Sequence, residues 1–300
     1  MIKNKKSQAK KVELTNRELY FKAKEEILNK KLEISDSEIY TLLIVVNKLG
    51  SFTDIINDFD KKCLNPQLFY SYLNEIIKGK PIQYVTHIAP FLDFDFYVDE
   101  RVLIPRPETE GLALLVTNFI KENKIKHDRI FDCCTGSGCL AIYLKAMFED
   151  SKIYASDISL DALEVAKVNA NKYKADIHFL NGDKIKPFIE EDLLGDVLIS
   201  NPPYVKNKED IEEKVKKFEP MNAIYDETGV SFYLNFIENW DKYLKDNFMM
   251  AFEINYDQEN ELKEIINEYL DEKTNFHFYK DIYNLTRYLI IVRGYENVTF

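Results

Sequence analysis

The residues of this 300-residue chain best suited to chemistry form the run Asn201-Pro202-Pro203-Tyr204. Prolines stiffen a turn and remove backbone N–H donors, so their carbonyl oxygens remain as acceptors beside the Asn201 side-chain amide. Such a small, rigid group of oxygen acceptors suits a planar –NH2 group. We therefore expect this run to hold a planar nitrogen for reaction, although a plain strand-ending turn is the simpler alternative.

A second candidate site is the segment that runs from Asp132 through Cys133, Cys134, Thr135, Gly136 and Ser137 to Gly138. Its two glycines would let a ligand approach the backbone closely where the chain turns into a helix. Asp157 follows about 20 residues beyond the first of them, where a carboxylate can bind two ribose hydroxyls. The pair predicts an adenosine-containing ligand without choosing between NAD and S-adenosylmethionine. A tight turn and a helix-capping Asp are the structural alternatives.

The elements that must position these residues alternate between helix and strand from about residue 109. Strands are expected at 129–132, 152–157, 177–180, 196–200, 248–252, 276–279 and 288–292. Repeated β-α units predict a doubly wound, mainly parallel, Rossmann-like sheet. No helix-length segment separates the last two strands, so these should be antiparallel. Each candidate segment follows a predicted strand, at the sheet edge where ligands bind in such folds.

The first 80 residues are expected to form a small helical bundle. Thr15 with Glu18, and Ser35 with Glu38, have the spacing of a capping box. Gly50 should end the second of these helices, and Asn65-Pro66 should begin a later one. The bundle carries no recognisable chemistry, and its aromatic residues are expected in its core. We expect a domain at 1–80, a hairpin or linker at 81–108 and an α/β domain at 109–300.

Composition excludes several classes of protein. Lys and Arg number 40 against 51 Asp and Glu, a net charge of −11, which argues against a protein held on DNA by phosphate neutralisation. No uncharged apolar run reaches the ~18 residues of a membrane span. The basic start, 1–11, lacks the apolar segment of a secretory signal and should be a solvated tail. The isolated histidines predict no metal site. The cysteine spacing forms no disulfide framework, so a cytoplasmic location is expected.

Together, these motifs resemble the class I S-adenosylmethionine-dependent methyltransferases that act on planar amide or exocyclic nitrogen. Pro81-Ile-Gln-Tyr84 and Leu103-Ile-Pro-Arg-Pro-Glu-Thr-Glu110 are closely similar to the HemK/PrmC-type peptide chain release factor glutamine methyltransferases. The resemblance runs from about residue 80 to the C-terminus, and that family also has a helical N-terminal domain. Further segments that match are Glu219-Pro220, Phe252-Glu253-Ile254 and Asp281…Arg287.

The resemblance implies methyl transfer from S-adenosylmethionine to the glutamine of the Gly-Gly-Gln loop of release factors, with S-adenosylhomocysteine as the product. It implies no metal, no stable nucleic-acid partner and no membrane, and it assigns substrate recognition to the helical domain. The cofactor positions that match are Cys134, Thr135, Gly136, Ser137, Gly138, Asp157, Asp183, Lys184 and Asn201. The substrate positions are Asn201, Pro202, Pro203, Tyr204 and Arg106, of which Asn201, Pro202 and Tyr204 are the catalytic ones.

Specific roles follow for these positions. The Asn201 side-chain oxygen and the Pro202 carbonyl would accept the two N–H bonds of the substrate amide, and Tyr204 would wall the pocket. Arg106 would line the site or pair with a carboxylate. Thr109 would cap the following helix, and Glu253 would face the cofactor or bond within the fold.

The sequence departs from the family pattern at three positions. Cys134 and Asn255 stand where the family usually has Gly, and Lys184 stands where an aromatic or apolar residue often packs on adenine. Cys134 must therefore adopt a backbone angle compatible with a Cβ atom.

Three other functions compete with glutamine methylation. An adenine-N6 methyltransferase shares the Asn-Pro-Pro-Tyr run but needs a basic surface with stacking aromatics, which the charge disfavours. A binding protein without catalysis has no need of an intact Asn201 and Asp157. An NAD-dependent oxidoreductase has no need of the Asn-Pro-Pro-Tyr run, and this sequence offers no obvious catalytic Tyr-x-x-x-Lys or His-Asp arrangement for one.

Overall fold

The computed structural model describes residues 13–300, so the basic segment 1–11 lies outside the described residues. The chain divides into two compact units, with the boundary between Thr86 and His87. Each unit has its own hydrophobic core. None of the helices in the described part of the chain is long and apolar enough to cross a membrane.

The first unit is a bundle of short helices around an aliphatic core. Both capping boxes are present, with Thr15 and Ser35 each bonded reciprocally to the Glu three residues later, as predicted. Asn65 is the N-cap of a helix whose first residue is Pro66, also as predicted. The helices are α1 (Asn16–Asn29), α2 (Asp36–Val46), α3 (Phe52–Asn57), α4 (Pro66–Ile77) and α5 (Ile82–Thr86).

The prediction that Gly50 ends the second helix is wrong, because α2 stops at Val46. The buried side chain of Asn47 donates to Asn16 Oδ1 and to the Leu43 carbonyl, and it accepts from the Leu64 N–H. These bonds fix Asn47 as the C-cap, and the chain then turns through Lys48 at φ 56°. The stop signal is therefore a polar side chain that bonds to distant segments rather than a glycine.

The segment at 81–108 contains both a helix and a hairpin. Helix α5 belongs to the helical unit, which therefore extends to Thr86, beyond the boundary at residue 80 expected from the sequence. The antiparallel strands β1 (Ala89–Phe91) and β2 (Phe94–Phe96) follow in the second unit. Asn169 fixes the chain just after this hairpin, since its side chain makes two hydrogen bonds with the Tyr97 backbone.

The second unit is built on a seven-stranded sheet with the order β5-β4-β3-β6-β7-β9-β8. The predicted doubly wound, mainly parallel sheet is confirmed, as is the antiparallel pairing of the last two strands. The strands are β3 (Arg129–Cys133), β4 (Lys152–Asp157), β5 (Ile177–Asn181), β6 (Gly195–Ser200), β7 (Leu244–Glu253), β8 (Thr274–Lys280) and β9 (Thr286–Arg293).

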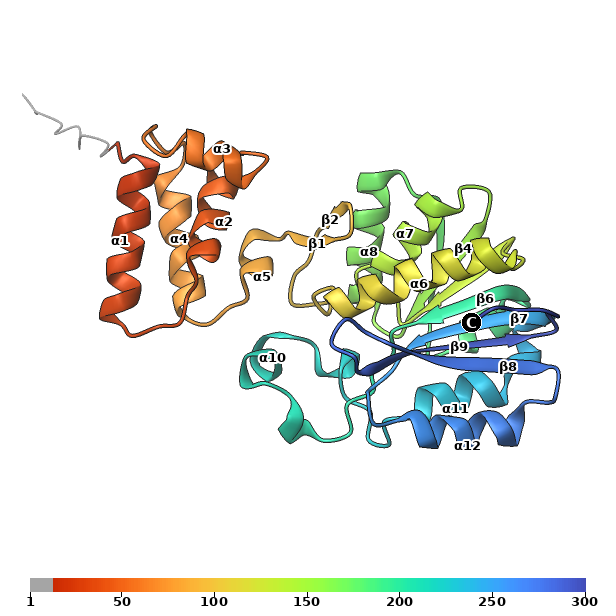
Figure 1. Ribbon diagram of the computed structural model, residues 1–300. Coiled ribbons are helices and arrows are strands. Elements are labelled where there is room, and N and C mark those ends of the chain that lie inside the picture. The colour runs from red at the N-terminus through yellow and green to blue at the C-terminus, as the bar shows by residue number, and fades with distance from the viewer. Residues whose placement is uncertain (1–12) are drawn as a thin grey trace, which may run out of the picture. The chain divides into compact units, whose positions relative to one another are not determined.

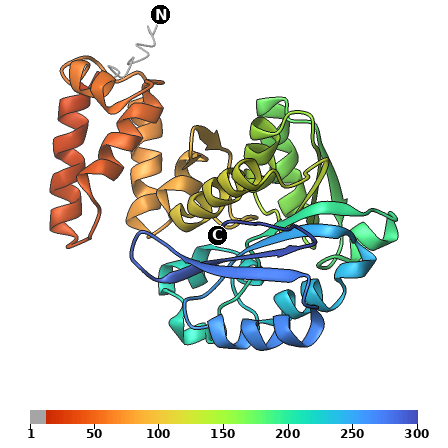
Figure 2. The same cartoon turned by 45° about the vertical axis from the view of Figure 1, so that its right-hand side comes forward.

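Helices cover both faces of this sheet (Figure 1). Helices α6 (Pro107–Asn123), α7 (Cys139–Met147) and α8 (Leu160–Tyr173) lie on one face, and α11 (Ser231–Glu238) and α12 (Glu259–Tyr269) lie on the other. The turned view in Figure 2 shows the same layers. Two shorter helices, α9 (Lys186–Glu190) and α10 (Glu213–Phe218), lie in the connections after β5 and β6.

The strand order places the candidate residues together. The chain runs outward from β3 through β4 to β5 and then returns to β6 on the other side of β3. At such a switch point two neighbouring strands send their connections to opposite faces, which opens a crevice at their carboxyl ends. The glycine-rich segment follows β3 and Asn201 follows β6, so both candidate segments border this crevice.

Candidate active site

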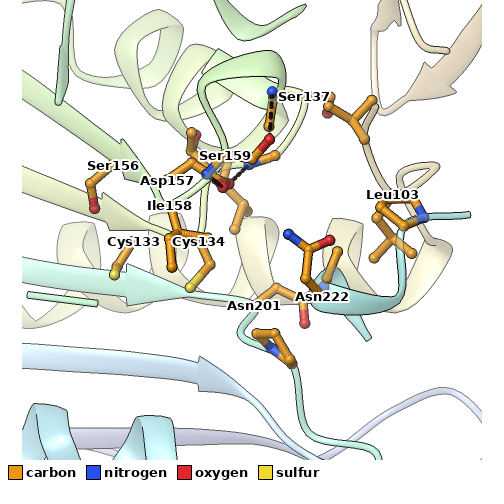
Figure 3. Close-up of a pocket in the computed structure, with 18 of the residues that line it drawn as sticks. Leu103, Cys133, Cys134, Ser137, Ser156, Asp157, Ile158, Ser159, Asn201 and Asn222 are labelled. Atoms are coloured by element: carbon orange, nitrogen blue, oxygen red, sulfur yellow. Dashed lines mark hydrogen bonds between the residues drawn. The ribbon is translucent and has the colours of Figure 1, made fainter. Parts of the chain in front are cut away.

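A cavity of about 270 Å³ lies at the carboxyl ends of β3, β4 and β6. Asp157 and Ser159 lie on one side of it, and Asn201 and Asn222 lie on another (Figure 3). The cavity is bordered by most of the residues expected in the site, namely Arg106, Cys134, Thr135, Gly136, Ser137, Asp157, Asp183, Lys184, Asn201 and Pro203.

The glycine-rich turn brings bare backbone to the cavity. Gly136 has a φ of +54°, and a Cβ placed there would meet no atom within 4 Å, so this position is open toward the cavity. Cys134 has a φ of +62°, a left-handed conformation that a Cβ permits only at a cost. Cys134 thus adopts the backbone angle for which the family pattern has Gly. The turn keeps the same backbone conformation, and the Cβ of Cys134 adds strain to it.

Gly138 does not border the cavity. It is the N-cap of α7 at φ +83°, and a Cβ there would lie 3.2 Å from the Ala166 Cβ of α8. The residue therefore allows α7 and α8 to pack closely beside the site instead of contacting a ligand.

Asp157 at the end of β4 is held by the backbone. Its Oδ2 accepts the Gly136 N–H over 2.9 Å, and its Oδ1 accepts the Ser159 N–H over 2.9 Å. Burial raises the pKa of Asp157, while these backbone bonds lower it in part. Ser159, not Asp157, is the N-cap of α8. Each carboxylate oxygen keeps a lone pair for a further donor.

Two residues beside Asp157 complete this side of the cavity. Ile158 borders it with 59% of its side chain exposed, which offers an apolar surface. Lys184 has a φ of +50° and carries its Nζ 4.7 Å from the centre of the Phe232 ring. Ile158 was not among the predicted site residues, although an isoleucine directly after a candidate ribose-binding carboxylate was a signal for it.

Asn201 at the end of β6 presents one end of its amide to the protein. Its Nδ2 donates to Thr109 Oγ1 over 2.9 Å. Its Oδ1 has no hydrogen-bond partner among residues 13–300 and is left as an acceptor. Thr109 itself donates to Glu253 Oε2 over 2.7 Å, so the expectation that it caps a helix is wrong.

A smaller cavity of about 100 Å³ adjoins the first through shared residues Arg106 and Asn201. Pro202 and Tyr204 border only this smaller cavity. The Tyr204 hydroxyl donates to Glu253 Oε1 over 3.0 Å. Burial raises the pKa of both Tyr204 and Glu253. A small recess, lined mostly by apolar side chains, therefore extends from the main cavity toward Glu253.

Both roles expected for Arg106 are found. It forms an ion pair with a carboxylate, and it borders both cavities. Its Nη2 lies 2.5 Å from Oε1 of the buried Glu219, whose other oxygen accepts the Ile104 N–H. The Leu103–Glu110 segment is thus tied to the loop after β6.

Within residues 13–300, no three His, Cys, Asp or Glu side chains are grouped so as to hold a metal ion.

Comparisons with known proteins agree with this arrangement. Residues 109–221 match the family model "Methyltransferase small domain". The release factor glutamine methyltransferase of Clostridium acetobutylicum is 31% identical over 271 residues, which cover 89% of this chain and 93% of that protein. The release factor glutamine methyltransferase of Staphylococcus aureus is 39% identical over 205 residues, or 67% of this chain and 72% of that protein.

Among solved structures, the release-factor-specific protein-(glutamine-N5) methyltransferase of Alicyclobacillus acidocaldarius has a TM-score of 0.42 and 20% identity, covering 66% of this chain and 99% of that one. The extent of the sequence matches is decisive, because 31% identity is kept over nearly the whole length of both proteins in the Clostridium comparison. The chain belongs to the family of release factor glutamine methyltransferases.

Proposed function

We propose that this enzyme transfers a methyl group from S-adenosylmethionine to the side-chain amide nitrogen of the glutamine in the Gly-Gly-Gln motif of peptide chain release factors. The observation that carries the assignment is the orientation of the Asn201 side-chain amide. Its Nδ2 donates to Thr109, and its Oδ1 has no hydrogen-bond partner in the described part of the chain, at a residue that borders both the main cavity and the recess. A substrate carboxamide needs such an acceptor for its –NH2 group.

The residues around the main cavity fit S-adenosylmethionine. Asp157 retains lone pairs for the two ribose hydroxyls, and Ile158 offers an apolar surface to the adenine. The open backbone at Gly136 leaves room for the rest of the molecule. Asp183 and Lys184 complete the proposed contacts. When bound, this cofactor supplies a methyl group activated by a positively charged sulfur, and it leaves as S-adenosylhomocysteine.

The chain's own contribution is to hold a poor nucleophile in place. The lone pair of an amide nitrogen is delocalised into its carbonyl, so the reaction depends on alignment. We propose that Asn201 Oδ1 and the Pro202 carbonyl accept the two N–H bonds of the glutamine side chain. These oxygens would also stabilise the positive charge that develops on the nitrogen as its bond to the methyl group forms and the methyl–sulfur bond breaks. That charge is lost when the nitrogen releases one of its two protons, which leaves the neutral methylamide. Pro203 and Tyr204 would shape the pocket and exclude water, and Arg106 would border its entrance.

The helical unit is proposed to recognise the protein substrate. It carries a partly exposed aromatic cluster on α1, α2 and α3, in which the buried Tyr20 stacks on Tyr40 at 4.9 Å. Phe52 packs edge-on to Tyr40 at 4.9 Å, and Phe21 packs edge-on to Tyr20 at 5.3 Å. Phe21 and Phe52 are both more than half exposed, so the expectation that the aromatics lie in the core is wrong for these two, whereas Tyr20 and Phe69 are buried as expected. Exposed aromatics of this kind are typical of protein interfaces.

The proposed partners and location follow the same chemistry. The net charge of −11 suits a basic protein surface better than nucleic acid. The four cysteines are free thiols, as a reducing compartment such as the cytoplasm requires.

The direct test is incubation with methyl-labelled S-adenosylmethionine and a purified release factor, followed by mapping of the labelled residue. We expect label on the glutamine of the Gly-Gly-Gln motif. Label on adenine of added nucleic acid instead would favour the adenine-N6 alternative. Asn201→Ala should abolish transfer while cofactor binding stays measurable by calorimetry. Asn207→Ala is the matched control, because Asn207 is exposed in the same loop and bonds only to Asp210 among the described residues.

A further inference from the structure

The hydrogen bonds behind Asn201 form a chain with a fixed direction. Asn201 Nδ2 donates to Thr109 Oγ1 over 2.9 Å, and Thr109 Oγ1 donates to Glu253 Oε2 over 2.7 Å. The other carboxylate oxygen, Oε1, accepts the Tyr204 hydroxyl over 3.0 Å. Thr109 is 3% exposed and Glu253 is 1% exposed, so water does not compete for these bonds.

The direction of this chain follows from the number of protons available. In the structure each Glu253 carboxylate oxygen accepts one hydroxyl hydrogen bond, Oε2 from Thr109 and Oε1 from Tyr204. The single proton of the Thr109 hydroxyl is therefore committed to Glu253. Thr109 can then only accept from Asn201, which must turn its –NH2 end toward Thr109. The carbonyl end of the Asn201 amide is left for the substrate.

We propose that Thr109 and Glu253 are positioning residues that fix the orientation of the Asn201 amide, so that its oxygen and not its nitrogen meets the substrate amide. The reversed amide would place –NH2 against the –NH2 of the substrate, where the two groups repel. This inference rests on the proposed function, because it assumes that the ligand at Asn201 is a hydrogen-bond donor.

Glu253 also anchors both ends of the Asn201–Tyr204 turn. It holds Tyr204 directly and Asn201 through Thr109, and it is 144 residues from Thr109 in sequence. The Tyr233 hydroxyl donates to the Glu253 backbone carbonyl over 2.7 Å, which fixes the end of β7 itself. The first turn of α6, the end of β7 and the substrate turn after β6 are thereby locked in one arrangement.

The test replaces Thr109 by residues of matched size. Thr109→Val keeps the shape but removes the hydroxyl, and Thr109→Ser keeps the hydroxyl. With a release factor as substrate, Thr109→Val should lower kcat by about 10- to 100-fold. This is less than the roughly 100- to 1000-fold lost with a preorganised group that itself contacts the reacting atoms, because Thr109 acts through Asn201. The affinity for S-adenosylhomocysteine, measured by calorimetry, should be unchanged. Thr109→Ser should restore most of the turnover.

Thr117→Val is the matched control for loss of a buried hydroxyl. Thr117 lies on the same helix, is also 3% exposed, and donates only to the Ala113 carbonyl among the described residues. Its replacement should leave kcat unchanged. Glu253→Gln should resemble Thr109→Val, and the double variant should lose little more, since both act through one network. Equal losses in the two Thr→Val variants, or additive losses in the double variant, would contradict the proposal.

A readout without turnover separates this proposal from the proposed function. With 15N-asparagine labelling, the Asn201 side-chain –NH2 signal is identified by its absence in Asn201→Ala. The proposal expects slowed solvent exchange of these protons in the wild type and in Thr117→Val, and faster exchange in Thr109→Val. Slow exchange in an enzyme that does not label release factor would reject only the proposed function. Exchange that Thr109→Val does not alter would reject the positioning role.

Discussion

Gly136 donates its backbone N–H to Asp157 Oδ2 over 2.9 Å, which joins the turn after β3 to the end of β4. One hydrogen bond thus connects the two segments that the sequence marked as cofactor-binding. It orients the carboxylate toward the cavity while the open Gly136 position leaves space beside it.

Replacing Asp157 with Asn should weaken cofactor binding. The amide keeps the size of the side chain but offers only one acceptor oxygen, so one of the two ribose hydroxyls loses its acceptor. Because a hydrogen bond to a charged group contributes about 1.5–3 kcal/mol, affinity should fall by at least about tenfold. Calorimetry with S-adenosylhomocysteine measures this. Asp161→Asn is the control, since Asp161 is exposed in the first turn of α8. Equal affinities in the two variants would remove Asp157 from the cofactor site.

Cys134→Gly should stabilise the protein. Cys134 has a φ of +62°, and a side chain in the left-handed region costs about 1–2 kcal/mol. Glycine removes that strain but adds flexibility to the unfolded chain, so a net gain of about 1 kcal/mol is expected. Chemical denaturation measures it. Ser137→Gly in the same turn should destabilise instead, because Ser137 is not among the described residues with positive φ. Destabilisation by both changes would show that the backbone at Cys134 is not strained.

Asp132 should make stability depend on pH. It is buried, it accepts bonds from Thr135 Oγ1 and the Ala141 N–H, and burial raises its pKa to about 7 from an ordinary 3.8. Between those two pH values the folded protein binds a proton that the unfolded chain has released. The free energy of unfolding therefore falls as pH rises through this range, and the loss is complete above about 7.

Asp132→Asn removes the carboxyl group that binds this proton. The fall in the free energy of unfolding between pH 4 and 7 should therefore be smaller in the variant. Urea denaturation at several pH values gives the comparison. An identical pH dependence in the wild type and the variant would show that Asp132 is ionised throughout the range.

The aromatic cluster of α1, α2 and α3 should affect recognition of whole release factors only. Phe21→Ser and Phe52→Ser should each raise the KM for a release factor by about fivefold or more, since truncating an aromatic that dominates an interface costs more than about 1 kcal/mol. Turnover of a short peptide containing Gly-Gly-Gln should be unchanged. Phe69→Ser is unsuitable because Phe69 is fully buried, whereas exposed Leu114→Ser on α6 is a suitable control. Unchanged KM in both Phe variants would place recognition elsewhere.

The sequence by itself determined the features that depend on local pattern. Strand and helix alternation predicted the sheet, the lack of a helix between the last two strands predicted their antiparallel pairing, and Thr15 and Ser35 predicted their capping boxes. The residues of Asn201–Tyr204 and Asp157 were recognisable because they lie at the carboxyl ends of predicted strands, and parallel strands bring these ends to one edge.

Only the tertiary structure decided which partners these residues have. The end of α2 depends on Asn47 bonding to Asn16 and Leu64, and the orientation of Asn201 depends on Thr109 and Glu253. Such partners lie far apart in sequence, and a hydrogen bond depends on the distance and direction of atoms in space. Residue type and spacing therefore located the site, while the packing of α6 against the end of β7 decided which atom of Asn201 faces the ligand.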